Sequence, residues 1–249
     1  MHHTLNTRAR SSSMDDLDGY SIGPPVTIIQ NDEKNRVEMH IRGDLPPPQV
    51  VSMELTTLDK MASSFNTLVV YINTPGGSGD TMTELLSIMK RYKTVITVSC
   101  GQAASAGFIL WCAGHVRVVQ DYSVLMAHRE SYEMRGKTEQ HLSVASFNQK
   151  NFSRLLSRVC GHVLSEAEQE TAKITEVFLS AEDAVNRKVA ISWEDFIARD
   201  NQGIETVTYV MVGGSTYQLL DEDTLADPSD PDGTPININQ IMYGLPYKI

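Results

Sequence analysis

The segment GQAASAG, residues 101–107, most constrains the fold, because it places one serine between small residues where a strand meets a helix. Residues 94–100, TVITVSC, are uncharged and rich in β-branched side chains, which predicts a buried strand. Residues 106–114, AGFILWCAG, are apolar, which predicts a buried helix. Ser105 then lies at a helix N-terminus, where free N–H groups stabilise negative charge. It is either a nucleophile or an N-cap, since serine is a favoured capping residue.

A second glycine-containing turn lies upstream of this segment. Residues 68–73, LVVYIN, predict an apolar strand, and the Pro-Gly-Gly sequence at 75–77 predicts a turn that another backbone or a substrate can approach closely. Such a turn can present N–H groups to an oxyanion. An ordinary strand-to-helix loop is the alternative, because residues 82–89 follow with the apolar spacing of a packed helix.

A histidine ends a third predicted strand. The apolar run SVLMA, residues 123–127, is followed directly by His128. Site residues of α/β sheets gather at strand ends, and imidazole titrates near neutrality, so His128 has the chemistry of a general base for Ser105. A structural histidine is the alternative.

These blocks together resemble the Clp protease proteolytic subunit, a serine peptidase family with a crotonase-like fold. The resemblance runs through INTPGGS, GQAASAG, LMAH and EVFLSAEDAV in the same order and with nearly the same separations, over roughly residues 37–196. It implies an α/β protein built from repeated ββα-type units with a projecting handle helix.

The resemblance also implies roles for individual residues. Ser105 aligns with the family's nucleophile and His128 with its base, while the backbone N–H groups of Gly77 and Ala106 align with the oxyanion-hole donors. The family has an aspartate two residues before the Phe-Leu-Ser-Ala block, and this chain has Glu176 there. A glutamate can also hold the tautomer of the base, although its extra methylene shifts the carboxylate.

Composition narrows the choice of partners and cofactors. The net charge of −10 argues against a nucleic-acid surface, and no run of 18 apolar residues is available to cross a membrane. We expect no metal and no cofactor, because the sequence has neither a metal-type Cys/His cluster nor a phosphate-binding loop. The N-terminus lacks the apolar segment of a secretory signal, and Cys100, Cys112 and Cys160 form no C-x-x-C pair, so we expect reduced thiols in a cytoplasmic protein.

The chain divides into three expected parts. Residues 1–25 are a polar arm, residues 26–197 form the peptidase domain with a largely parallel sheet, and residues 198–249 form a C-terminal extension. The extension contains a hairpin signal around Gly213-Gly214, an acidic linker at 221–233 and an apolar tail. The linker lacks carboxylates at positions that a calcium loop needs, so calcium is not expected. Such an extension would fit a divergent copy carried by a virus or plasmid, and a virally encoded copy would act in the host cytoplasm.

A long helix is expected at residues 137–160, with an interrupted apolar stripe and Gly161 as its stop. In the family the equivalent helix interlocks two rings, which implies an oligomer contact and a homo-oligomer of stacked rings. A further helix begins at Ser165, whose spacing to Glu168 predicts a capping box. The family's rings enclose the serines and leave substrate selection to an ATP-dependent unfoldase partner.

The sequence therefore predicts a serine endopeptidase that cleaves peptides or unfolded proteins inside an oligomeric chamber. One alternative is an inactive ring or shell component, in which Glu176 fails to complete the triad. Another is a crotonase-type acyl-CoA enzyme, which also uses glycine-rich oxyanion turns. The serine of GQAAS followed by a strand-end histidine argues against this last class.

Overall fold

A computed structural model describes most of the chain. The described residues are 24–129, 138–202, 209–212, 215–221, 224–226 and 236–237, with the backbone alone at 138–143 and from 202 onward. The expected arm up to residue 23 and the expected apolar tail at 238–249 lie outside them.

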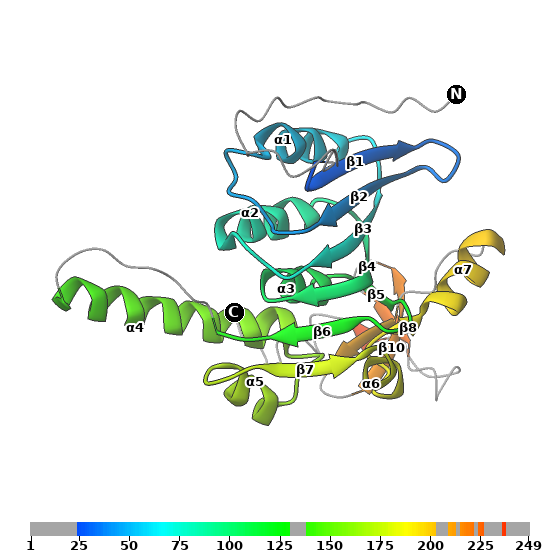
Figure 1. The fold of residues 1–249 in the computed structure, drawn as a ribbon. Helices are drawn as coiled ribbons and strands as arrows, with labels where there is room; N and C mark the ends of the chain where they lie inside the picture. Colours follow the sequence, from blue (N-terminus) through cyan, green and yellow to red (C-terminus); the bar gives the residue numbers. More distant parts are fainter. Residues whose placement is uncertain are drawn as a thin grey trace, which may run out of the picture.

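An eight-stranded sheet forms the centre of the molecule (Figure 1). Its main path runs β1-β2-β3-β4-β5-β8, while β6 pairs with both β4 and β7. All pairs are parallel except β1–β2 and β6–β7, which confirms the prediction of a largely parallel sheet. The strands are β1 (Val26–Asn31), β2 (Arg36–Arg42), β3 (Thr67–Thr74), β4 (Thr94–Ala104), β5 (Val116–Val119), β6 (Val124–Ala127), β7 (Val177–Ser180) and β8 (Ile191–Ser192).

Helices connect the strands, and α1, α2 and α3 lie together along one side of the sheet (Figure 1). The predicted capping box at the start of α5 is confirmed, because Ser165 and Glu168 bond each other's backbone N–H groups. The helices are α1 (Ser52–Met61), α2 (Gly79–Met89), α3 (Ala106–Cys112), α4 (Thr138–Leu155), the π-helical turn η1 (Leu156–Cys160), α5 (Glu166–Ala172), α6 (Ala181–Asn186) and α7 (Trp193–Gln202).

The central strands are buried on both faces, and their alternate residues belong to two cores. Leu68 and Val70 of β3 point into a large core shared with α1, α2 and α3, while Val69 points into a smaller one. Phe196 of α7 closes this smaller core with 1% of its surface exposed. The uninterrupted apolar runs of β3 and β4 follow from this two-sided burial.

Strand β4 has different neighbours along its length. Residues 96–99 pair with β5, whereas residues 102–104 pair with β6. The strand is longer than the expected residues 94–100, because this second pairing extends it as far as Ala104. The carboxyl end of β4 therefore lies beside β6 rather than β5.

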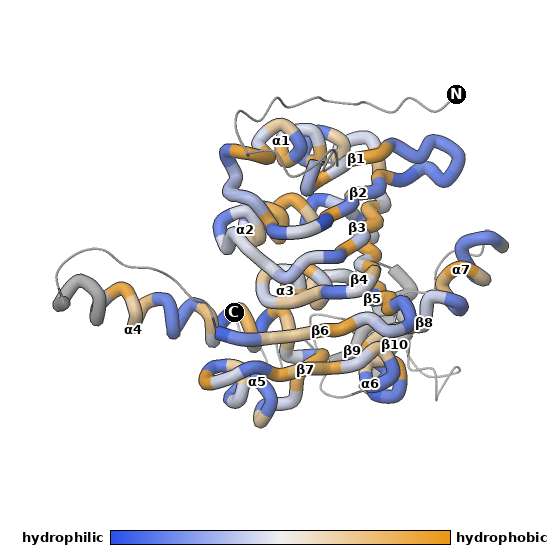
Figure 2. Tube along the Cα trace, viewed as in Figure 1, coloured by the Kyte–Doolittle hydropathy of each residue, from blue (hydrophilic) through white to orange (hydrophobic). Residues whose placement is uncertain are grey.

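The α4 helix projects away from the sheet (Figure 1). Hydrophobic residues alternate with polar ones on the projecting part of α4 (Figure 2), where Val144 is 43% and Phe147 is 62% exposed. At its base, Phe152, Leu156 and Cys160 are buried in the large core. The helix expected at 137–160 is thus confirmed, with its last turn wound as a π-helix.

The described part of the C-terminal extension contains a separate four-stranded antiparallel sheet in the order β12-β11-β10-β9. The predicted hairpin is confirmed, because Val212 pairs with Ser215 across the two glycines. The linker expected from residue 221 is wrong at its start, since β11 pairs there with β10. The strands are β9 (Tyr209–Val212), β10 (Ser215–Asp221), β11 (Thr224–Ala226) and β12 (Ile236–Asn237).

The expected domain boundary at residue 197 falls inside α7. Asp200, beyond that boundary, forms ion pairs with Lys34 and with Arg36 of β2. Among the helices of the described residues, none combines the length and the apolar character that a bilayer crossing needs.

Candidate active site

Ser105 occupies a strained turn between β4 and α3. Its backbone has φ 55° and ψ −120°, a region that residues with a side chain rarely adopt. Its N–H donates to the carbonyl of Met126 on β6 over 2.8 Å, which ties the turn to the neighbouring strand. Although Ser105 holds the N-cap position of α3, its side chain makes no capping hydrogen bond. The capping alternative therefore does not account for the serine hydroxyl.

The first turn of α3 leaves an N–H group beside this serine. The N–H groups of Phe108 and Ile109 donate to the Ser105 carbonyl, whereas no hydrogen bond of the described residues uses the N–H of Ala106. The helix residues behind it are all buried, with Trp111 donating from Nε1 to the Val118 carbonyl over 3.0 Å. The start of α3 is thus fixed in place, and the Ala106 N–H remains available as a hydrogen-bond donor.

The Pro-Gly-Gly turn between β3 and α2 is held from two sides. The Thr74 hydroxyl accepts from the Gly76 N–H and donates to the Gly76 carbonyl, each over 3.0 Å. Leu45 donates its N–H to the same carbonyl over 2.7 Å and accepts from the N–H of Ser78 over 2.8 Å. Gly76 and Gly77 have φ 123° and 129°, which glycine alone adopts readily.

This turn lies directly against the serine. A Cβ atom on Gly76 would come within 2.6 Å of the Ser105 Cβ and 3.1 Å of its Oγ. A Cβ on Gly77 would meet the Leu45 carbonyl oxygen at 2.3 Å. Both positions therefore require glycine, because of the close approach as well as the positive φ. Gly76 touches Ser105, and the next residue, Gly77, is exposed.

His128 and Glu176 flank one end of the antiparallel pair β6–β7. Ala127 pairs with Val177, so the next residue on each strand, His128 and Glu176, continues the same register. Opposite residues of an antiparallel pair lie about 5 Å apart at Cα and project to the same face. Because β6 also borders the end of β4, the ends of three neighbouring strands bring Ser105, His128 and Glu176 together.

The three residues lie at neighbouring strand ends, and within the described residues no hydrogen bond or ion pair joins their side chains. No hydrogen bond links the Ser105 hydroxyl to His128, and no ion pair links His128 to Glu176, whose side chain is exposed. Catalytic hydrogen bonds are often long before substrate binds. In the part of the chain that is described, no group of three or more His, Cys, Asp or Glu side chains could hold a metal ion.

Three residues that support the site were not anticipated. Leu45, Thr74 and Met126 hold the Pro-Gly-Gly turn and the serine through backbone and hydroxyl groups. Leu45 and Met126 act through backbone atoms that any residue provides, so their side chains carry no sequence signal. Thr74 lies between the strand predicted at residues 68–73 and the proline, where a threonine looks like an ordinary residue of a strand-to-helix loop.

Comparison with protein families shows the family of the chain. The family model described as Clp protease matches residues 47–187. The matched span includes both glycine-containing turns and all three strand ends that carry Ser105, His128 and Glu176. The match supports a mixed α/β fold of that family and peptidase activity in general. Because it covers more than half of the 249 residues, the chain belongs to the Clp protease family.

Proposed function

We propose that the protein is a serine endopeptidase with Ser105 as nucleophile, His128 as base and Glu176 as the group that orients the base. The observation that carries this proposal is the strained backbone of Ser105, whose hydroxyl does no capping and lies against the glycine turn. Strain of this kind is characteristic of nucleophiles on strand-to-helix turns.

The reaction is acyl transfer in two steps. His128 accepts the proton of the Ser105 hydroxyl as the oxygen attacks the scissile carbonyl, and the N–H groups of Gly77 and Ala106 bind the resulting oxyanion. His128 then gives the proton to the leaving amine, which leaves an acyl-enzyme. Water, deprotonated by His128, releases the acyl group, and Glu176 accepts the other N–H of the imidazole throughout.

The proposed substrates are peptides and unfolded proteins in the cytoplasm, cut inside a chamber of stacked rings. The projecting α4 helix supports the assembly, because Val144 and Phe147 on it are exposed apolar side chains that a second copy would cover. An ATP-dependent unfoldase is the proposed partner, since a closed chamber admits only unfolded chains.

A second candidate function is a catalytically inactive ring or shell component. The observation that favours it is the lack of any hydrogen bond joining Ser105, His128 and Glu176 in the described residues, together with the glutamate in place of aspartate. Such a protein would keep the fold and the assembly without turnover.

Labelling with a fluorophosphonate probe separates the two functions. We expect the wild-type chain to be labelled and the Ser105→Ala variant to remain unlabelled, because the probe reacts with an activated serine. Ser99→Ala is a matched control, since Ser99 lies earlier on β4 and its buried hydroxyl has no hydrogen-bond partner among the described residues. An unlabelled wild-type protein that is folded and assembled would favour the inactive component.

A further inference from the structure

A cavity of about 690 Å³ opens at the end of α3 that is opposite to Ser105. It lies between the C-terminal parts of α2 and α3, the turn before β5, and the base of α4 with η1. Small-molecule sites typically have volumes of about 300 to 1,000 Å³. The cavity is therefore large enough for a ligand, and it takes no part in the proposed peptidase site.

The charged residues that line the cavity are all basic. Lys90, Arg117, Arg154 and Arg158 contribute to its wall, and among the described residues no aspartate or glutamate does so. Within the described residues, no ion pair joins any of these four cations to a carboxylate. The whole chain carries a net charge of −10, so the cavity wall is positively charged in a molecule that is acidic as a whole.

Arg117 is the buried member of this group, with 6% of its surface exposed. Its Nε donates to the Val189 carbonyl over 2.8 Å and its Nη1 to the Gly114 carbonyl over 2.5 Å. A guanidinium has five N–H donors, so these two bonds leave donors unused. Burial lowers the pKa of Arg117 to about 10, which still leaves it charged at neutral pH. A buried cation without a carboxylate partner is stabilised by an anion.

His162 adds an unpaired polar atom to the same wall. Its Nε2 is buried and has no hydrogen-bond partner among the described residues. Burial, with the nearby charge of Arg117, lowers the pKa of His162 to about 3, so the ring is neutral at pH 7. Buried polar atoms are nearly always hydrogen-bonded, and an unpaired one beside a cavity indicates a missing partner.

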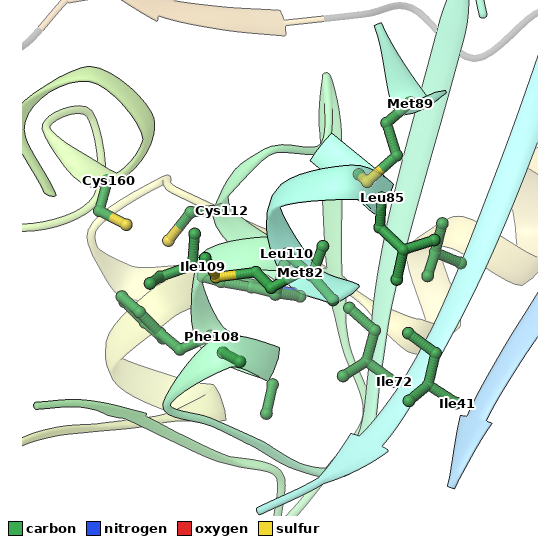
Figure 3. Packing of buried hydrophobic residues seen from close by; sticks show 14 of the residues in the cluster. Ile41, Ile72, Met82, Leu85, Met89, Phe108, Ile109, Leu110, Cys112 and Cys160 are labelled. Atoms are coloured by element: carbon green, nitrogen blue, oxygen red, sulfur yellow. The ribbon is translucent and has the colours of Figure 1, made fainter. Parts of the chain in front are cut away.

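The rest of the wall is apolar. Met82 and Leu86 of α2 face the cavity from one side, and Leu155 and Val159 face it from the other. Figure 3 shows Met82 and Cys112, two residues of the cavity wall, among the packed residues of the neighbouring core. The C-terminal ends of α2 and α3 contribute roughly half a negative charge each, which offsets only part of the four positive charges.

We propose that this cavity binds a small amphiphilic anion. Its phosphate or carboxylate head would contact Arg117, Arg154 and Arg158, because arginine pairs with both groups through two parallel hydrogen bonds. Its aliphatic part would lie against Met82, Leu86 and Leu155. A head group alone would leave the apolar wall uncovered, and a neutral chain would leave the cations unpaired.

Calorimetric titration of the full chain tests this site with four probes. Octyl phosphate and octanoate differ in their head group, inorganic phosphate lacks the chain, and octyl glucoside lacks the charge. We expect at least one of the two charged octyl probes to bind about tenfold or more tightly than inorganic phosphate and octyl glucoside, a difference well within calorimetric resolution. The tighter of the two identifies the head group.

Variants locate the binding. Arg154→Gln with Arg158→Gln removes two exposed cations and should weaken the tighter probe about tenfold or more, while Arg91→Gln, a neighbour of Lys90 that pairs with Asp59 outside the cavity, should leave it unchanged. Ala113→Leu fills the cavity without changing its charge and should also weaken binding. Equal affinities for octyl phosphate, octanoate and octyl glucoside, an unchanged affinity in the double variant, or no binding at millimolar probe would overturn the proposal.

Discussion

At the scale of single residues, the proposed active site depends on a glycine that does no chemistry. Gly76 lets the turn between β3 and α2 touch the serine side chain. A larger residue is excluded by its φ of 123° and because an added Cβ would lie only 2.6 Å from the Ser105 Cβ. In the proposed mechanism, this contact sets the distance between the Ser105 hydroxyl and the N–H of Gly77. Positioning of this kind is worth several orders of magnitude in rate.

Gly76→Ala should therefore lower kcat/KM for peptide hydrolysis by about 100-fold or more, because the new methyl displaces the turn from Ser105. Gly79→Ala is the matched control, since Gly79 has an ordinary φ and open space around its Cα. Rates and thermal unfolding should be measured for both variants. Full activity in a folded Gly76→Ala protein would contradict the contact's role.

Glu176 supports a second prediction. Glu176→Gln should lower kcat strongly and change KM little, because in the proposed mechanism the carboxylate stabilises the imidazolium that forms only during the reaction. Glu176→Asp should retain activity or raise it, and Glu84→Gln, an exposed glutamate on α2, should have no effect. Steady-state kinetics checks all three variants. If Glu176→Gln turns over at the wild-type rate, another group orients His128 or none does.

Residues of the candidate site could be predicted from the sequence where the side chain, or the absence of one, is what the site uses. Ser105 and Gly77 stood in recognisable segments, and His128 ended a clear apolar run. Leu45 and Met126 were not predictable, because they contribute an N–H or a carbonyl from a distant part of the chain. The pairing of β6 with β7, which aligns His128 with Glu176, is likewise a tertiary contact without a local pattern.

At the scale of elements, α4 combines a buried base with an apolar outer part. Leu156 is 1% exposed and Leu155 packs against the same core, so the base belongs to the fold itself. Charged substitutions at those two positions would report on folding rather than on assembly. Phe147, which is 62% exposed on the projecting part, is therefore the residue that tests the proposed contact between copies.

Phe147→Glu should dissociate the proposed assembly while the protomer stays folded, because it places a charge in an apolar contact without touching the core. Gln149→Glu adds the same charge at an exposed polar position of the same helix and should leave assembly intact. Analytical ultracentrifugation with circular dichroism distinguishes dissociation from unfolding. A wild-type chain that sediments as a folded monomer at micromolar concentration would contradict the ring assembly.

Elements were predicted best where one pattern spans the whole element. The helix at 137–160 and the hairpin at Gly213-Gly214 follow directly from apolar spacing and a two-residue turn. The extension of β4 beyond Cys100 did not follow, because small residues such as those of GQAA have weak strand preference and pair only when β6 lies beside them.

At the scale of the whole molecule, α7 is tied to the opposite part of the sheet by charge. Asp200 pairs with Arg36 and Lys34, and Arg36 also binds Glu38, in a group whose arginine is 6% exposed. Burial raises the pKa of Asp200, but the hydrogen bonds and positive charges of Lys34 and Arg36 outweigh it, so the pKa is lowered overall. The ionised carboxylate therefore stabilises the folded chain.

Because the pKa of Asp200 is lower in the folded state than in the unfolded state, the ionised carboxylate contributes its full stabilisation at pH values above the unfolded-state pKa of about 3.9. This stabilisation is lost as the pH falls below that value. Asp200→Asn should cost about 1 to 3 kcal/mol at pH 7, since it removes a charged hydrogen-bond acceptor, and the difference from wild type should shrink below about pH 4. Asp44→Asn, an exposed aspartate, is the control. Urea unfolding at several pH values measures these differences, and a pH-independent loss would contradict the ion-pair explanation.

The register between β6 and β7 determines both the position of His128 relative to Glu176 and the packing of the core. Leu125 and Leu179 face the core in the register that sets His128 opposite Glu176, while Phe178 faces outward. A slip by one residue would reverse every side chain of the strand and expose those leucines. A molecule with a misaligned histidine would therefore also be a misfolded one, so errors in catalytic geometry are removed by the same forces that assemble the protein.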